Sequence, residues 1–118
     1  MMPDLLLIED NAELRRVLTE AVEMDGFTVT IAHDAEEGLE LLHTSYLPAV
    51  ILCDVVMPHM SGLDFLRYIR TNPSWAEITF IAMSGTVVAR QEALAAGANH
   101  YLVKPFNFQD LYEILAQN

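Results

Sequence analysis

The sequence predicts an α/β three-layer sandwich, in which helices cover both faces of a parallel β-sheet. Five strand-like apolar runs alternate with five helical patterns along the 118-residue chain. The runs are mostly continuous in Val, Ile and Leu, as is typical of strands that are buried on both faces. Right-handed crossovers between such strands place the helices on the two sides of the sheet.

The first two units begin with apolar runs at residues 5–8 and 27–32, which we interpret as buried strands. Between them, apolar residues at positions 14–22 recur at helical spacing on one face, so this segment is expected to cover the sheet as an amphipathic helix. The second helix is expected to start at Asp34, whose side chain can cap free N–H groups while Glu37 reaches back, as in a capping box.

The third unit combines a strand at residues 49–53 with a helix that begins near Ser61. Asp64 follows Ser61 by three residues, which is typical of a capped helix start, and Pro73 bounds the end of the helix. The residues expected to face inward are Leu63, Leu66 and Ile69.

The last two units contain strands at residues 78–83 and 101–103. The fourth helix is expected over residues 87–96, where Gly97 ends it, and the fifth over residues 108–116. The inward residues of the fifth helix are expected to be Leu111, Ile114 and Leu115.

Composition limits the functions that are open to the chain. The formal net charge of -11 argues against direct nucleic-acid binding, because phosphate backbones are bound by clustered Lys and Arg. No apolar stretch approaches the roughly 18 residues of a membrane span, and the start Met-Met-Pro-Asp lacks the basic residue of a secretory signal. Cys53 is the single cysteine, so no internal disulfide forms. We expect one domain over residues 1–118 in the cytosol.

Candidate site residues follow four of the five expected strands, at the edge where ligands bind in open parallel sheets. Glu9 and Asp10 follow the first strand, Asp54 the third, Ser84 and Gly85 the fourth, and Lys104 the fifth. Three carboxylates at one rim raise one another's pKa values unless a cation compensates. Oxygen ligands suit Mg²⁺, Mn²⁺ or Ca²⁺, and no His/Cys group indicates zinc.

Lys104 is the only lysine in the chain, and therefore the only ammonium side chain available to this rim. It can pair with a carboxylate or with a phosphoryl oxygen, and the Ser84 hydroxyl can donate to the same oxygens. Backbone N–H groups of Val56 and Gly85 can complete an anion cradle. Asp54 is the best candidate for a nucleophile, because metal, ammonium and hydroxyl would surround its carboxylate.

Four segments resemble those of bacterial response-regulator receiver domains. They are Leu-Ile-Glu-Asp-Asn at 7–11, Ile-Leu-Cys-Asp-Val-Val-Met-Pro-His-Met-Ser-Gly at 51–62, Met-Ser-Gly at 83–85 and Gly-Ala-Asn-His-Tyr-Leu-Val-Lys-Pro-Phe at 97–106. Finding the Asp-x-x-Met-Pro-x-Met-Ser-Gly and Tyr-x-x-Lys-Pro-Phe patterns in order with the acidic pair is very specific. The resemblance covers the whole chain and implies a flavodoxin-like (βα)5 fold with strand order 2-1-3-4-5.

By this resemblance, Asp54 accepts a phosphoryl group from a histidine kinase or histidine phosphotransfer protein of a two-component phosphorelay. Glu9, Asp10 and the backbone carbonyl of Val56 join Asp54 in holding Mg²⁺, for which Mn²⁺ can substitute. The chain is then a signalling switch and not an enzyme, since it catalyses only its own phosphorylation and slow autodephosphorylation.

The resemblance also assigns the parts of the switch. Lys104 and Ser84 contact the phosphoryl oxygens, and Tyr101 is the aromatic residue whose rotamer follows Ser84. The surface of the fourth and fifth strand–helix units then changes and controls an output domain or a partner protein. The bond between Lys104 and Pro105 is expected to be cis.

Some positions depart from the family pattern. Ser84 stands where Thr is common and Glu9 where Asp is common, but each keeps the hydroxyl or the carboxylate. The short segment 84–97 predicts a truncated or irregular fourth helix. Asn99 and His100 replace the acidic pair of many DNA-binding regulators, and the last helix has no arginine. These differences argue against a charge-paired dimer and leave a weak homodimer open.

Three other functions are alternatives to a phosphorylated receiver. An aspartyl phosphohydrolase similar to the haloacid dehalogenases needs a second acid two residues after the nucleophile, where this chain has Val56. A flavodoxin-like cofactor binder needs a Ser/Thr/Gly-rich phosphate loop after the first strand, where Glu9 and Asp10 repel phosphate. A receiver that docks partners without phosphorylation is the remaining alternative.

Overall fold

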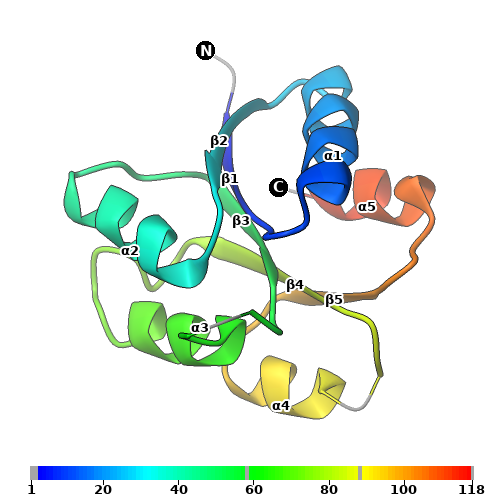
Figure 1. Cartoon of the computed structure of the whole chain (residues 1–118). Helices are drawn as coiled ribbons and strands as arrows, with labels where there is room; N and C mark the ends of the chain where they lie inside the picture. The colour runs from blue at the N-terminus through cyan, green and yellow to red at the C-terminus, as the bar shows by residue number, and fades with distance from the viewer. Residues whose placement is uncertain (1–2, 58, 88, 118) are drawn as a thin grey trace.

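The computed structural model describes residues 3–57, 59–87 and 89–117. The strands are β1 (Asp4–Ile8), β2 (Thr28–Ala32), β3 (Val50–Asp54), β4 (Thr79–Ser84) and β5 (His100–Val103). The helices are α1 (Ala12–Met24), α2 (Ala35–His43), α3 (Gly62–Arg70), α4 (Arg90–Ala95) and α5 (Phe108–Leu115). The strands form one parallel sheet in the order β2-β1-β3-β4-β5 (Figure 1), which confirms the predicted fold.

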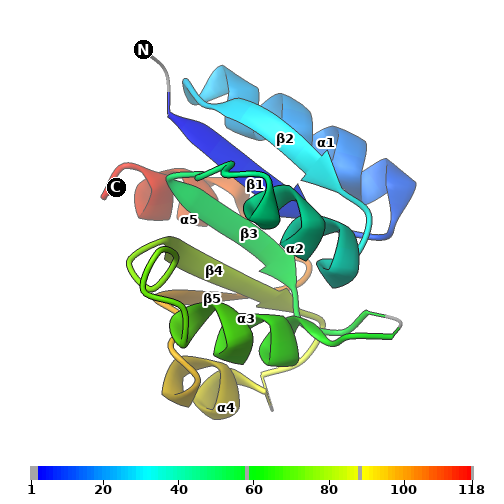
Figure 2. The same ribbon diagram turned by 90° about the vertical axis from the view of Figure 1, so that its left-hand side faces the viewer.

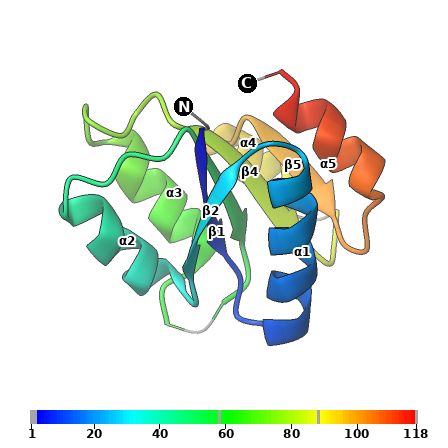
Figure 3. The same ribbon diagram turned by 90° about the horizontal axis from the view of Figure 1, so that it is seen from above.

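Two apolar cores lie on opposite faces of the sheet. One core joins α1 and α5 to the strands, and the other joins α2, α3 and α4 to them. Figure 2 shows α2 and α3 in front of the sheet, and Figure 3 shows α1 and α5 together on its other side. In β1, Leu5 and Leu7 enter the first core while Leu6 and Ile8 enter the second, because side chains alternate along a strand.

The expectation that every strand is buried is wrong for β2. Thr28 and Ile31 are exposed, and Val29 and Thr30 are half-buried. The reason is position, since β2 is an edge strand and pairs only with β1. β1 and β3 lie inside the sheet, and every residue of β3 is buried.

Side chains cap four of the helices as their sequences predict or allow. Asn11, Asp34, Ser61 and Asn107 accept hydrogen bonds from the first turns of α1, α2, α3 and α5. The capping box of α2 differs in detail, because the Glu37 carboxylate accepts from the backbone N–H of His33, 3.3 Å away. In the described part of the chain, no helix combines the length and the apolarity needed to cross a membrane.

Three helix predictions need correction. Leu63 and Ile114 are half-buried instead of fully inward, while Phe65 is completely buried on the face of α3 that meets the sheet. α4 covers six residues, Arg90–Ala95, so the predicted bounds 87–96 are too long, whereas the truncation predicted from the short segment 84–97 is confirmed. Met1 and Met2 of the N-terminal sequence, Pro58 of the Met-Pro motif and Val88 of the predicted fourth helix lie outside the described residues.

Candidate functional site

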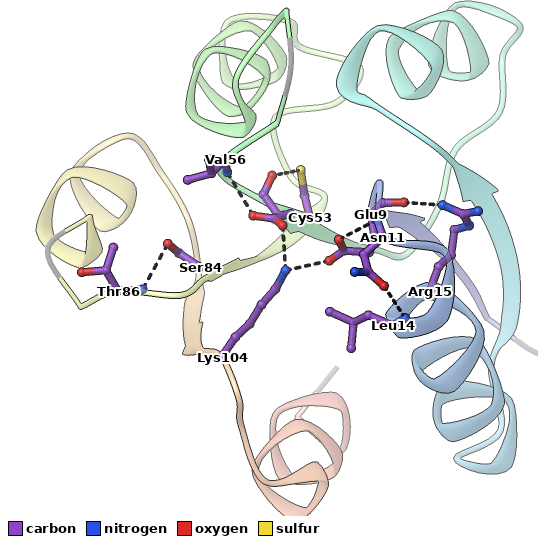
Figure 4. Close-up of polar contacts among 10 residues, drawn as sticks. Glu9, Asn11, Leu14, Arg15, Cys53, Val56, Ser84, Thr86 and Lys104 are labelled. Atoms are coloured by element: carbon purple, nitrogen blue, oxygen red, sulfur yellow. Dashed lines mark hydrogen bonds and ion pairs between the residues drawn. The ribbon is translucent and has the colours of Figure 1, made fainter.

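The carboxyl ends of the strands bring the predicted polar residues to one edge of the sheet (Figure 4). Glu9 follows β1, whereas Asp54 and Ser84 are the last residues of β3 and β4. Their exposed fractions are 1%, 7% and 1%, and within the described chain they are the buried polar or charged residues. Buried carboxylates are unstable without a partner, so this edge must supply compensating groups.

Lys104 supplies that compensation in the present structure. Its ammonium nitrogen lies 2.8 Å from Oε1 of Glu9 and 2.6 Å from Oδ2 of Asp54. Burial raises the pKa of Glu9 from its ordinary value, and the hydrogen bond from Lys104 opposes that rise only in part. Burial also acts to lower the pKa of Lys104, but its hydrogen bonds to Asp54 and Glu9 outweigh burial and raise it. The only lysine of the chain therefore bridges two buried acids as a stable cation.

The carboxylate of Asp54, at the end of β3, is held in place by its neighbours. Its Oδ1 accepts a hydrogen bond of 3.0 Å from the backbone N–H of Val56, while Oδ2 faces Lys104. Behind it, Gly62 at the start of α3 lies directly on the Asp54 backbone. A Cβ at position 62 would sit 2.4 Å from the Asp54 carbonyl oxygen and 2.7 Å from Cα of Val55. This close approach fixes the loop that follows Asp54.

Glu9 is oriented by the start of α1. Its Oε2 accepts a 3.1 Å hydrogen bond from the N–H of Asn11, and its backbone carbonyl accepts a 2.9 Å bond from Arg15. The sequence did not predict this contact of Arg15, because a basic residue on an amphipathic helix is usually solvated. Only the position of Arg15, about one and a half helical turns after the acidic pair, indicates that its side chain can reach back to Glu9.

The three acidic groups can hold a metal ion together. One carboxylate oxygen each from Glu9, Asp10 and Asp54 lies within 4.8 Å of the others, and Asp10 is exposed at the mouth of the site. A set of oxygen donors with one solvent-facing member fits Mg²⁺, which keeps several water ligands. Val56 contributes its N–H to Asp54 in this structure, and the residue is 69% exposed.

Ser84 and Tyr101 both contact Thr86, in the loop between β4 and α4. The Ser84 hydroxyl accepts a long, 3.4 Å hydrogen bond from the N–H of Thr86. The hydroxyl of Tyr101, which is buried on β5, donates a 2.5 Å bond to the Thr86 carbonyl. Gly85 is exposed, and a Cβ added there would meet no atom within 4 Å. The Lys104–Pro105 bond is cis, as predicted.

Comparison with known proteins identifies the family. The family model for the response regulator receiver domain matches residues 5–116. The chain belongs to this family. It is 38% identical over 110 residues to the transcriptional regulatory protein CpxR of Escherichia coli K12, covering 93% of this chain and 46% of CpxR. It thus spans less than half of that curated relative. An uncharacterized 14.6 kDa protein of Leptolyngbya boryana is 35% identical, with 97% of this chain and 88% of that protein covered.

Solved receiver structures resemble the whole chain. The chemotaxis response regulator CheY4 of Vibrio cholerae is 28% identical with a TM-score of 0.89, and the match covers 99% of this chain and 98% of CheY4. The response regulator TrrA of Thermotoga maritima, in complex with Mg(2+)-BeF, is 27% identical with a TM-score of 0.89 and 98% coverage of both chains. These matches confirm the resemblance found in the sequence.

Proposed function

We propose that this receiver domain is a phosphorylated switch in which Asp54 accepts a phosphoryl group from a phosphohistidine donor in an Mg²⁺-dependent reaction. The observation that carries the proposal is the Lys104 ammonium, which contacts Asp54 and Glu9 at the buried rim beside Asp10. A phosphoryl group on Asp54 would need a cation beside its oxygens and acids that hold a metal ion, and these residue types support the proposal.

Phosphoryl transfer asks the protein mainly to position groups and to balance charge. A carboxylate oxygen of Asp54 attacks phosphorus as the phosphorus–nitrogen bond of the donor breaks, and the electron pair of that bond returns to the imidazole. Glu9 and Asp10, with Asp54 and the Val56 carbonyl, would hold Mg²⁺ or Mn²⁺. The bound ion would offset negative charge on the phosphoryl oxygens. Lys104 is already in contact with Asp54 and needs only a small shift to pair with those oxygens.

The switch would follow from a reorientation of the Ser84 hydroxyl. In this structure that hydroxyl accepts from Thr86, whose carbonyl is bound by Tyr101. When it turns to donate to a phosphoryl oxygen, with the Gly85 N–H beside it, the loop before α4 loses one contact. The surface of α4, β5 and α5 then changes and acts on an output domain or partner.

The partners follow from the same mechanism. A histidine kinase or histidine phosphotransfer protein would supply the phosphoryl group, and the chain would act in the cytosol as a switch with no other substrate. CpxR is a transcriptional regulatory protein, and this chain matches only 46% of it. By analogy, DNA contacts would belong to an output domain and not to this acidic domain. Any homodimer would be weak.

Val56 leads to a prediction about the lifetime of the aspartyl phosphate. Its exposed side chain lies beside Asp54 and offers no polar group to orient an attacking water. Val56→Glu or Val56→Asn is therefore expected to speed the loss of the phosphoryl group severalfold, as followed by mass spectrometry after donor removal. An unchanged rate in both variants would contradict this role, and Leu47→Asn, at an exposed position in the loop before β3, is the matched control.

Intact mass spectrometry tests the proposed function. Wild type, Asp54→Asn and Lys104→Ala are incubated with acetyl phosphate and Mg²⁺, with chelator as control. We expect one phosphoryl adduct on the wild type that requires the metal and no adduct on Asp54→Asn. On Lys104→Ala we expect a smaller fraction of the protein to carry the adduct. No adduct on the wild type, even with a phosphorylated histidine protein as donor, would instead support a receiver that docks without phosphorylation.

A further inference from the structure

The two ends of α4 are held in different ways. The residue before its first turn is Ala89, which has αR backbone angles and makes no side-chain cap hydrogen bond. Ala93 is the only buried residue among the six of this helix. Because most helix stability in proteins comes from a packed apolar face, a helix this short and this exposed depends on a few specific contacts.

Arg70 fixes the segment that follows the C-terminal end of α4. Its guanidinium donates to the carbonyl of Gly97 at 3.1 Å, to Oδ1 of Asn99 at 3.0 Å and to the carbonyl of Ala76 at 3.0 Å. Gly97 has a φ of +112°, and a Cβ there would lie 3.0 Å from Cγ of Arg70. Burial lowers the pKa of Arg70. This end is therefore packed and bonded to α3 and to the start of β5.

Arg67 holds the other half of α4, one turn earlier on α3. Its Nη2 lies 3.0 Å from Oε1 of Glu92, and its Nη1 lies 3.4 Å from Oδ1 of Asp64. The Arg67 and Glu92 side chains are 49% and 59% exposed. Water therefore competes for this ion pair, which opens far more easily than the contacts of Arg70.

We propose that Arg67 is a positioning residue of the switch, whose ion pair with Glu92 latches the first half of α4 to α3 while Arg70 holds the other end as a pivot. The loop that contacts Ser84 and Tyr101 through Thr86 leads directly into the latched end. Opening the latch lets that end follow the loop without unfolding the sheet. The consequence for phosphorylation rests on the proposed function, whereas the latch itself does not.

Amide hydrogen exchange measured by NMR, without any phosphodonor, tests the latch. Arg67→Glu and Glu92→Lys place like charges together, and the double variant restores an opposite pair. Each single variant is expected to speed exchange at the Ala93 amide by about two- to fivefold, the range of an exposed ion pair. The double variant is expected to return toward the wild-type rate, and the amide of Asn99 to remain unchanged.

Two outcomes in the Arg67 and Glu92 variants would overturn the latch. One is an Ala93 exchange rate that does not change in the single variants, and the other is a double variant that exchanges as fast as both effects combined. Gln91→Lys is the matched control, since it adds a cation to the same half of α4 at the neighbouring exposed position. An equal acceleration in Gln91→Lys would assign the effect to helix charge and also contradict the latch.

A titration with Mg²⁺ and beryllofluoride tests the coupling to the site. Both single variants are expected to bind beryllofluoride more tightly, by a factor no larger than their gain in exchange, and the double variant to return toward wild type. Because the two substitutions change net charge in opposite directions, a gain in affinity shared by both variants cannot come from net charge.

Faster amide exchange without tighter beryllofluoride binding would overturn the positioning role of Arg67. No beryllofluoride binding by the wild type would contradict the proposed function. The amide exchange rates would still test the latch, because they are measured without a phosphodonor.

Discussion

α3 and α4 cover the same face of the sheet next to each other, yet they are built differently (Figure 1). α3 has a serine cap and four buried residues, and its first residue, Gly62, touches the Asp54 backbone. α4 has no side-chain cap and one buried residue. The loop that follows the expected acceptor, Asp54, is thus joined to a firmly packed helix, and the loop after Ser84 to a weakly packed one.

This difference suggests how one small domain both receives a group and responds to it. An acceptor carboxylate must keep its geometry toward metal and donor, since small displacements are costly in phosphoryl transfer. A responding surface must instead have a second arrangement within a few kcal/mol of the first. Segments of low local stability are the usual source of such motion.

The largest expected contrast comes from truncating one leucine on each helix. Leu66 of α3 is completely buried, so Leu66→Ala is expected to lower the free energy of unfolding by about 2–5 kcal/mol. Leu94 of α4 is 37% exposed, and Leu94→Ala is expected to change it by no more than about 1 kcal/mol. Urea denaturation measures both, and comparable losses would show that α4 is packed as firmly as α3.

A second contrast compares the glycines of the two loops. Gly62→Ala forces a Cβ against the Asp54 backbone and is expected to cost roughly 1–3 kcal/mol of stability and to disturb phosphorylation. Gly85→Ala meets no atom within 4 Å and is expected to stay within about 1 kcal/mol of wild type. A stable Gly62→Ala protein with normal phosphorylation would contradict the fixed acceptor loop.

The smallest contrast concerns the helix caps. Ser61 accepts a 3.1 Å hydrogen bond from Asp64, so Ser61→Ala is expected to cost about 0.5–2 kcal/mol in thermal or urea unfolding. Ala89→Ser is expected to gain less than about 0.5 kcal/mol, because a capping side chain needs extended backbone angles and Ala89 has αR angles. A larger gain would show that the first turn of α4 adapts readily to a cap.

Much of the fold was accessible from the sequence because periodicity and caps are local signals. Strand positions agree within one residue at each end, and the caps Asp34 and Ser61 act as predicted. The exposure of β2 could not be predicted from its own residues. It depends on the strand order, which places β2 at the edge of the sheet. α4 begins later than the predicted residue 87 because no capping side chain stands at its start.

In the site, too, the residues that follow strands were predictable from local sequence, whereas the contacts between distant segments were not. Glu9, Asp54, Ser84 and Lys104 were found because each follows a strand, and parallel strands bring their carboxyl ends together. The contact of Arg15 with the Glu9 carbonyl and of Gly62 with Asp54 depends on the path of the chain after the strand. The convergence of Ser84 and Tyr101 on Thr86 also required the folded loop.

The most direct test of a fixed acceptor and a mobile responder is an NMR titration of wild type and Asp54→Asn with Mg²⁺ and beryllofluoride. We predict large amide shift changes in residues 84–97 of the wild type, small changes at the buried Leu66 and Ile69 of α3, and no such response in Asp54→Asn. Equal changes in α3 and α4, or the same response in Asp54→Asn, would contradict the account.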